Sequence, residues 1–344
     1  MQQRRADGET CCCPWPACVR PLGSRVSHGR AAARKDESED RVDKAWRPVL
    51  TAGDLTRPGA YGLHLPALAG TDGLLVDAPE RWGDWHIELA TGSGRPTELV
   101  DDSRARLICE PSGWVNIDRA SSTSTFHLPT EPAAHEIAQP RLGMSAVIAA
   151  HWRGNYSFHA GVFLAAGAAW GVLGDKGGGK SSLMATLALM GVPVLADDAL
   201  ILDGRGQALA GPRCIDLREQ TAAALGVGES IGGVGTRERF RMRLGPVPCE
   251  VPLGGFIYLE WGKTAFAPVS PERRVGALAQ GFALRLPERS EQAHVALIEL
   301  LGLPMVRFRR PRALDHIQAS AQRLLAEIEA LGTPRGRPLS AGRH

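Results

Sequence analysis

One stretch near the middle of the chain restricts the fold more than any other, because it matches a complete eight-residue loop pattern. Gly174, Gly179, Lys180 and Ser181 fit G-x-x-x-x-G-K-[ST], with an apolar run before the loop and a helix-forming run after it. A phosphate chain on such a loop needs inward-turned backbone N–H groups, and glycine reaches the required angles without a Cβ penalty. The pattern therefore predicts a strand, a phosphate-binding loop and a helix, in that order.

The residues of this loop have separate expected roles in binding ATP and Mg²⁺. The start of the following helix adds unpaired N–H groups and the positive end of its dipole. Lys180 is expected to contact the β and γ phosphates, and the Ser181 hydroxyl to ligate Mg²⁺. Asp175 and Lys176 occupy variable positions of the pattern, and Ser182 has no forced role. The predicted nucleotide-binding residues are Gly174, Asp175, Lys176, Gly177, Gly178, Gly179, Lys180, Ser181 and Ser182.

Two adjacent aspartates follow the loop at a distance that fits one helix and one short strand. Asp197 and Asp198 stand 17 and 18 positions after Lys180, so this strand is expected to end beside the loop in a parallel or mixed sheet. Because side chains alternate along a strand, both carboxylates reach the phosphates only if the strand ends or bends here. One carboxylate can then hold Mg²⁺, and the other can accept the proton of an attacking hydroxyl. An acidic turn between two strands is the alternative interpretation.

A single histidine lies before the loop at a position from which it can reach the aspartates. His159 precedes Gly174 by 15 residues, at the start of a predicted hairpin. Across neighbouring strands its ring can orient or polarise a carboxylate base. A purely structural histidine is the alternative.

The chain divides by composition into four predicted segments around an α/β core. Residues 1–45 mix charged residues with Gly, Ser and Pro and lack apolar periodicity, which predicts a disordered tail. Residues 46–150 hold short apolar runs between Gly, Pro, Ser and Asp clusters, which predicts a small β-rich N-terminal domain. Residues 151–332 form the predicted P-loop domain, and residues 333–344 a second disordered tail.

The elements of the P-loop segment follow from apolar periodicity and glycine stops. Short strands are expected on either side of Asp197 and Asp198. The other predicted elements are a hairpin (161–165 and 169–173), a helix (181–190), a buried strand (251–261) and two closing helices (290–301 and 316–331).

Composition excludes some classes of protein. With 44% hydrophobic and 22% charged residues, 344 residues can bury a sizeable core. A net charge of +3 gives no electrostatic case for a nucleic-acid or membrane partner. The seven cysteines form no metal or disulfide framework, and no apolar segment of signal-peptide type follows Arg4 and Arg5, so the expected location is the cytoplasm. The oligomeric state is left open, a homo-oligomer included.

The segment HAGVFLAAGAAWGVLGDKGGGKSSLMATLALMGVPVLADDALIL (residues 159–202) resembles the catalytic core of the bacterial HPr kinase/phosphorylase family. It also resembles HPr-kinase-like serine kinases, among them tailoring kinases of some lasso peptide pathways. Three features coincide: a histidine about fifteen residues before the loop, the loop G-D-x-G-x-G-K-S, and an Asp-Asp pair at the end of the next strand. The resemblance implies a phosphoenolpyruvate-carboxykinase-like P-loop core.

The resemblance also assigns roles to these residues. Asp198 acts as the base toward a serine hydroxyl, His159 assists, and Lys180 and Ser181 hold Mg·ATP. The acceptor is then a serine in a peptide or small protein. Residues 1–150 do not match the amino-terminal domain of true HPr kinases.

Two further elements of the family pattern have approximate counterparts. The family carries an I-E-I-R-G-like motif whose acidic residue helps to bind metal, and IDLRE (215–219) is the nearest equivalent, although its glycine is missing. Asp216 therefore joins Ser181 and Asp197 as a predicted metal ligand. A catalytic arginine is expected before the strand FIYLEW, and alternating arginines on a strand also fit a solvated face. The candidates are Arg237, Arg239, Arg241 and Arg243.

The sequence thus predicts an ATP-dependent phosphotransferase of HPr-kinase-like fold. Two alternatives remain open. The first is a nucleotide-binding regulatory switch that transfers no phosphate. The second is a kinase of a small metabolite, for which a pocket lined by the N-terminal domain, rather than an open groove, is the expected observation.

Overall fold

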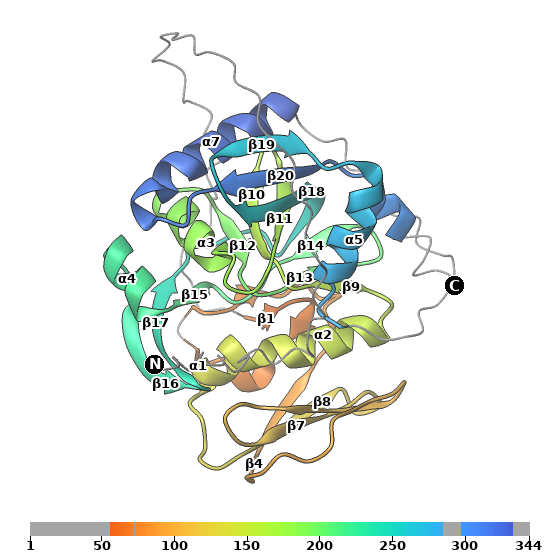
Figure 1. Cartoon of the computed structure of the whole chain (residues 1–344). Coiled ribbons are helices and arrows are strands. Elements are labelled where there is room, and N and C mark those ends of the chain that lie inside the picture. Colours follow the sequence, from red (N-terminus) through yellow and green to blue (C-terminus); the bar gives the residue numbers. More distant parts are fainter. Residues whose placement is uncertain (1–55, 72, 285–296, 333–344) are drawn as a thin grey trace, which may run out of the picture.

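A large mixed sheet forms the centre of the protein and carries helices on both faces (Figure 1). The computed structural model describes residues 56–71, 73–284 and 297–332 of the chain. The strands of this sheet are β9 (Tyr156–Phe158), β10 (Gly161–Ala165), β11 (Ala168–Leu173), β12 (Val194–Ala196), β13 (Leu200–Leu202), β14 (Gln207–Leu209), β18 (Glu250–Trp261), β19 (Ala265–Pro268) and β20 (Met305–Arg310). Their order is β12-β10-β11-β18-β14-β13-β9, and β20 pairs with both β18 and β19. Because β11, β18 and β20 are parallel, their carboxyl ends meet at one edge.

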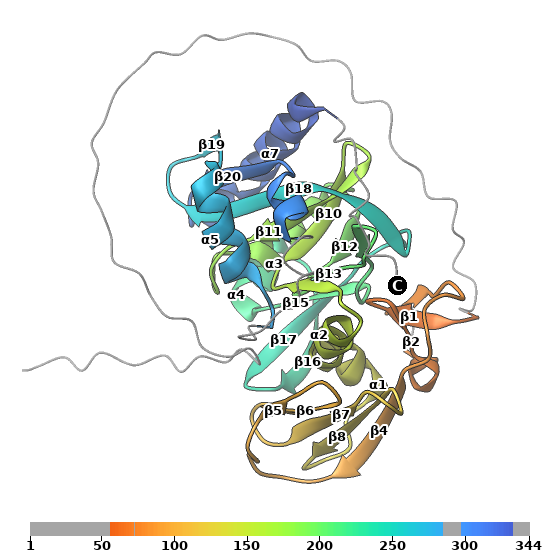
Figure 2. The ribbon, with the colours of Figure 1, turned by 90° about the vertical axis from the view of Figure 1, so that its right-hand side faces the viewer.

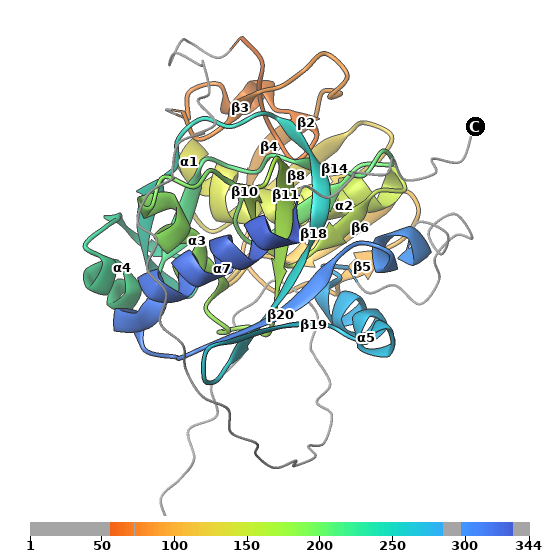
Figure 3. The same cartoon turned by 90° about the horizontal axis from the view of Figure 1, so that it is seen from above.

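Helices cover both faces of this sheet and explain why its strand β11 is apolar throughout. The helices α3 (Lys180–Leu189) and α7 (Ile317–Leu331) cross one face, as Figure 3 shows, and α2 (Leu142–Trp152) and α5 (Pro271–Gly281) cover the other. Along β11, Trp170 and Val172 belong to the core cluster beneath α3 and α7, whereas Ala169 and Leu173 belong to the cluster beneath α2 and α5. All six residues of β11 are buried, as expected for a strand covered on both faces.

Residues before α2 form two smaller sheets, as the β-rich pattern predicts. The first sheet contains β1 (Pro58–Ala60), β2 (Leu63–His64) and β3 (Val76–Asp77). The second contains β4 (His86–Thr91), β5 (Leu99–Val100), β6 (Arg104–Ile108), β7 (Trp114–Asp118) and β8 (Thr123–Leu128). The short turn η1 (Pro66–Leu68) follows β2. The predicted domain boundaries near residues 46 and 150 stay predictions.

The helix α2 is missing from the sequence prediction, which assigned this part of the chain to a β-rich region. Nine of its eleven residues are buried, so it shows no polar face and no amphipathic period. Figure 2 shows it between the central sheet and the sheet of β4 to β8. The Trp152 indole Nε1 donates to the Asp101 carbonyl at 2.8 Å and ties the helix to that second sheet. Two short helical turns, α1 (Ala134–Glu136) and η2 (Ile137–Arg141), lead into α2.

A third small sheet lies beside the central sheet. It has the order β15-β17-β16, formed by β15 (Cys214–Leu217), β16 (Glu229–Val234) and β17 (Arg237–Arg243), and α4 (Glu219–Leu225) follows β15. Arg213, just before β15, donates to the carbonyls of Val194 and Leu195 at 2.6 and 3.0 Å. These hydrogen bonds fix β15 next to β12.

Most predicted elements after residue 151 are present in the structure. The hairpin is β10 and β11, the helix is α3, the buried strand is β18, and the last helix is α7, preceded by the turn η3 (Leu314–His316). Residues 297–301 of the other closing helix are helical, and its remainder lies outside the described residues. Both predicted tails also lie outside them. None of the helices in the described part of the chain has the length and apolar character needed to cross a bilayer.

Candidate active site

The glycine-rich loop connects the end of β11 to the first residue of α3, as its pattern predicts. Gly174 and Gly179 have φ angles of 147° and 82°, in a region that favours glycine. A Cβ on Gly174 would lie 2.7 Å from the Leu259 carbonyl oxygen on β18, which is too close for any other residue. The loop therefore depends on glycine both for its backbone angles and for its approach to the neighbouring strand.

The lysine of the loop is buried and points back into it. Lys180 is 7% exposed, and its Nζ donates to the carbonyl oxygens of Gly174 and Asp175 at 2.8 and 3.2 Å. The ammonium group therefore lies within the curve of the loop, on the side of a large cavity. This cavity of about 740 Å³ contains Lys180 and residues 176–182 in its lining.

The aspartate pair lines the same cavity because the chain bends between the two residues. The strand β12 ends at Ala196, and Asp198 has a φ of 71°, in the left-handed region. The Ala199 amide donates to the Asp197 carbonyl at 3.0 Å and closes a tight turn. This turn breaks the alternation of a regular strand, so both carboxylates face the cavity. The bend that the sequence requires is present.

Asp197 is a buried carboxyl group next to the loop serine. It is 4% exposed, and burial together with the neighbouring Asp198 raises its pKa to about 8, although a hydrogen bond from the Ser181 side chain acts in the opposite direction. The Tyr61 hydroxyl donates to the Asp197 backbone carbonyl at 3.0 Å. Ser181 and Asp197, which the sequence predicts as metal ligands, are therefore in contact.

His159 lies beside Asp198 in an uncharged form. Burial and the Lys180 charge lower its pKa to about 4, against the opposing effect of Asp198 and a hydrogen bond to the Asp198 backbone. At neutral pH the imidazole is therefore neutral. The structure brings His159, Lys180, Asp197 and Asp198 together in the lining of one cavity, as the sequence predicts.

Gln139 is a cavity residue that the sequence analysis missed. It lies in η2 and is 3% exposed, and its Nε2 donates to Oδ2 of Asp198 at 3.0 Å. The main-chain carbonyl of Gln139 accepts from Arg241 Nη2 at 2.6 Å. No local pattern marks such a residue, since its contact with Asp198 depends on the way distant segments pack.

Arg310 is a second missed residue, and its position could have been inferred. Its side chain is fully buried at the carboxyl end of β20, Nη2 donates to the Gly179 carbonyl at 3.1 Å, and the guanidinium stacks 4.4 Å from the Trp261 ring centroid. Within the described residues no carboxylate pairs with it, and burial lowers its pKa to about 10. The rule that ligands collect at the carboxyl ends of parallel strands points to this position.

Asp216, a predicted metal ligand, forms a buried ion pair in this structure. Its Oδ1 and Oδ2 accept from Arg241 Nε and Nη2 at 2.7 and 2.9 Å, and Arg239 Nη1 is 3.7 Å from Oδ2. The Asp216 side chain is 1% exposed. Metal binding by Asp216 stays a prediction, and it would require Asp216 to exchange part of this pairing with Arg241.

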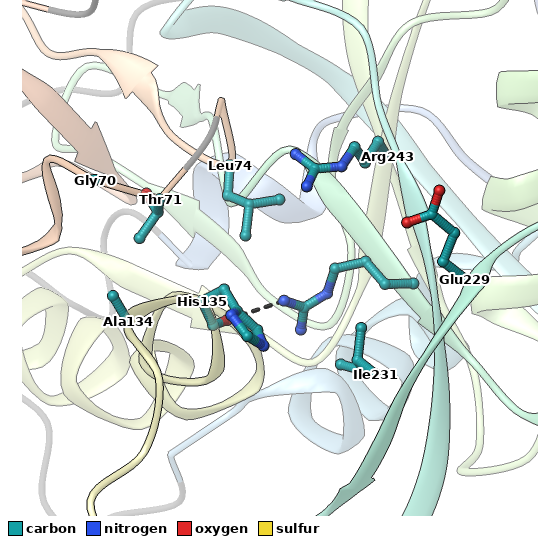
Figure 4. Close-up of a pocket in the computed structure, with 9 residues that line it drawn as sticks. Gly70, Thr71, Leu74, Ala134, His135, Glu229, Ile231 and Arg243 are labelled. Atoms are coloured by element: carbon teal, nitrogen blue, oxygen red, sulfur yellow. Dashed lines mark hydrogen bonds between the residues drawn. The ribbon is translucent and has the colours of Figure 1, made fainter.

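The four candidate arginines of β17 separate into different environments. Arg237 and Arg239 line the large cavity, whereas Arg241 forms an ion pair with Asp216. Arg241 and Arg243 line a second cavity of about 240 Å³. Figure 4 shows Glu229 and Arg243 on one side of this small cavity, opposite His135. Only Arg237 and Arg239 among the four face the aspartate pair's cavity.

Comparisons with known proteins find a match among solved structures. No protein-family model matches the sequence, and no curated protein matches it. Among solved structures, the HPr(Ser) kinase/phosphatase from Coxiella burnetii matches 51% of this chain and 99% of its own, at 15% sequence identity and a TM-score of 0.25. The chain thus resembles this enzyme in structure over half its length.

Proposed function

We propose that the chain is an ATP-dependent phosphotransferase that moves the γ-phosphate of Mg·ATP to a hydroxyl group, with Asp198 as the base. The observation that carries this proposal is the shared cavity: the glycine loop, Lys180 and Asp198 line one space of about 740 Å³, a size typical of small-molecule sites. The proposed core is of the phosphoenolpyruvate-carboxykinase-like P-loop type found in HPr kinases. The proposed acceptor is a serine in a peptide or small protein.

The residues around the loop fit a nucleotide and a magnesium ion. Ser181 and Asp197 contact each other, and a hydroxyl with a carboxylate is a donor set that Mg²⁺ accepts alongside phosphate oxygens and water. Within the described residues no group of three or more His, Cys, Asp or Glu side chains converges on one point. The loop amides, Lys180 and Arg310 would hold the phosphates. Mg²⁺ bound there would neutralise charge on the transferred group.

The proposed reaction needs one proton acceptor and a fixed geometry. The acceptor oxygen attacks the γ-phosphorus, its proton passes to the Asp198 carboxylate, and the bond from phosphorus to the β,γ-bridging oxygen breaks to leave ADP. Gln139 donates to Oδ2 of Asp198 and so fixes the orientation of the carboxylate that receives the proton. The neutral His159 holds the Asp198 backbone. Positioning and charge neutralisation supply most of the rate enhancement.

One observation favours a second candidate, a kinase of a small metabolite. The cavity is walled in part by residues of the N-terminal region, among them Tyr61, Cys109, Glu110 and Arg141. Such a wall suits a small acceptor better than an open groove does. The choice between the two acceptors depends on what receives the phosphate.

The test is transfer of label from γ-labelled Mg·ATP to fractionated extract of the source organism. Wild type, Lys180→Ala and Asp198→Asn are compared, and nucleotide binding is measured for all three. The proposal expects label on one peptide, protein or metabolite with wild type only, and nucleotide binding retained by Asp198→Asn. If wild type binds nucleotide and labels nothing, the regulatory switch becomes the better explanation.

A further inference from the structure

Three arginines stand around the acceptor end of the large cavity with little negative charge to balance them. We propose that the acceptor carries an oxyanion, a carboxylate or a phosphate, next to the hydroxyl that is phosphorylated, and that these arginines bind it. The inference rests on the proposed function and adds the chemical class of the substrate. The acceptor-side arginines are Arg141, Arg237 and Arg239.

The acceptor-side arginines come from two separate parts of the chain that meet at the cavity. Arg141 lies two positions after Gln139, which touches Asp198. On the other side, the turn between β16 and β17 approaches the N-terminal region: a Cβ built on Gly235 would lie 3.6 Å from the Glu110 carbonyl oxygen and 3.8 Å from Arg239 Nη2. The negative charge of Asp198 acts to raise the pKa of Arg239. The three arginines therefore line the cavity at its N-terminal wall, where Gly235 approaches Glu110 and Arg141 contacts Cys109.

The local carboxylates do not balance these charges. Arg141 Nε is buried without a hydrogen-bond partner, and this side chain contacts the Cys109 thiol, which is a weak acceptor. Glu110 is paired with Arg95, whose Nη2 lies 2.6 Å from Oε1. The Arg237 backbone pairs with Val234, but its side chain has no hydrogen bond or ion pair in the part of the chain that the structure describes.

The positive charge of Arg239 is also only partly balanced by a carboxylate. Its nearest carboxylate oxygen is Oδ2 of Asp216 at 3.7 Å, and that oxygen already accepts from Arg241 at 2.9 Å. Burial and the adjacent Arg237 charge lower the pKa of Arg239. The Arg239 side chain is 13% exposed and shares the Asp216 carboxylate with Arg241, so an oxyanion bound here would add charge-assisted hydrogen bonds.

The glycine loop has two cations of its own beside it. Lys180 and Arg310 stand at the glycine loop, where Arg310 Nη2 is 3.1 Å from the Gly179 carbonyl oxygen. Guanidinium groups suit planar, two-point binding of carboxylate and phosphate. The acceptor-side arginines are thus available for an anion on the second substrate.

The first experiment measures binding and needs no catalysis. Calorimetry with Mg²⁺ and a non-hydrolysable ATP analogue compares acceptors in pairs that differ only in the anion: a peptide Ser-Asp against Ser-Asn, a peptide Ser-phosphoserine against Ser-Ser, and serine against serinamide. The anionic member of at least one pair is expected to bind about tenfold more tightly or better. The pair with the largest ratio identifies the source of the oxyanion. Equal affinities within all three pairs would overturn the inference.

Variants then assign the preference to the arginines. Arg237→Gln and Arg141→Gln are expected to lose most of the preference, and Arg237→Lys to keep part of it. Arg106→Gln is the matched control, because Arg106 bonds Asn116 in the distant sheet of β6 and β7. Thermal unfolding and affinity for the ATP analogue show that each variant is folded. Full preference in both Gln variants would contradict the assignment.

A transfer assay with γ-labelled ATP on the same pairs separates the two proposals. A strong anion preference in binding without any transfer would leave the oxyanion site standing and remove the phosphotransferase. Transfer to neutral and anionic members at the same rate and affinity would support the phosphotransferase and overturn the oxyanion site.

Discussion

Gln139 Nε2 donates a hydrogen bond to Oδ2 of Asp198 across 3.0 Å, although 59 positions separate the two residues in the chain. The backbone of Gln139 is held in place, because its main-chain carbonyl accepts from Arg241 Nη2 at 2.6 Å. Arg241 is itself fixed by Asp216. The hydrogen bond from Gln139 fixes the orientation of the Asp198 carboxylate. A base that accepts the proton of an attacking hydroxyl needs such a fixed orientation.

Replacing Gln139 by leucine should slow phosphate transfer without weakening nucleotide binding. The variant keeps the volume but removes a hydrogen bond to a charged group, so we expect kcat to fall about tenfold while the Kd for ATP stays within twofold. Asn116→Leu is the control, since it removes another partly buried amide far from the cavity. A wild-type kcat in Gln139→Leu would show that the contact has no role in positioning Asp198.

Binding of Mg·ATP should release a proton from Asp197. With a pKa of about 8, the free protein holds Asp197 mostly protonated at pH 7, whereas a magnesium ligand must be a carboxylate. Calorimetry at pH 7 in buffers of different ionisation enthalpy should therefore report release of roughly one proton. Asp197→Asn should release none, and the same release in that variant would place the proton elsewhere.

Asp197 should also make the free protein less stable as the pH rises. Its folded pKa of about 8 lies above the usual value of 3.8, so between these values the folded state binds more protons than the unfolded state. The free energy of unfolding then falls with rising pH, by up to about 1.4 kcal/mol per pH unit for one proton. The depressed pKa of His159 acts in the opposite direction below pH 6.5.

Urea unfolding between pH 6.5 and 8 therefore isolates the effect of Asp197, because His159 is neutral in both states over most of that range. Asp197→Asn should flatten the decline that wild type shows. Parallel curves for the two proteins would mean that Asp197 titrates normally in the folded state.

Arg310→Met should weaken nucleotide binding and leave the fold intact. The guanidinium is fully buried beside Gly179 without a carboxylate partner among the described residues, and a buried charge adds little net stability. We expect the Kd for ATP to rise at least about tenfold. The free energy of unfolding should stay within about 1 kcal/mol of wild type. Arg323→Met, on the exposed face of α7, is the control.

Arg241→Met should be much more damaging than the removal of both partners of its ion pair. The single change leaves the Asp216 carboxylate buried without its main partner, which typically costs about 3–5 kcal/mol. Arg241→Met with Asp216→Leu removes both charges and should recover a large part of this loss in urea unfolding. Equal losses in the single and double variants would show that Arg241 acts through the carbonyls of His135 and Gln139 instead.

The sequence predicted those parts of the site that are local in the chain. The loop and the start of α3 follow from glycine positions and a continuous motif, and the spacing of Asp197 from Lys180 limits how far apart they can lie. The bend at Asp198 was a condition of the prediction, and the φ of 71° meets it. The role of each residue stays a prediction until activity is measured.

Other parts depend on packing between distant segments, which a local pattern does not encode. Gln139 and Arg141 contribute to the cavity only because η2 lies against β15 and β17. The helix α2 has no amphipathic period, since both the central sheet and the second sheet cover it. The choice among the arginines of β17 needed the register that pairs Asp216 with Arg241.

On the proposed function, the turn η2 contributes to the acceptor side of the cavity, and the glycine loop forms its nucleotide side. Most of the proposed nucleotide side lies in one stretch around α3, joined by Arg310 of β20, whereas Gln139 and Arg141 come from the stretch before α2. On the proposed function, substitutions before α2 would change the binding of the acceptor and leave the glycine loop unchanged. A shortened chain that starts at the hairpin would keep the loop, Arg237 and Arg239 and would lack Gln139 and Arg141.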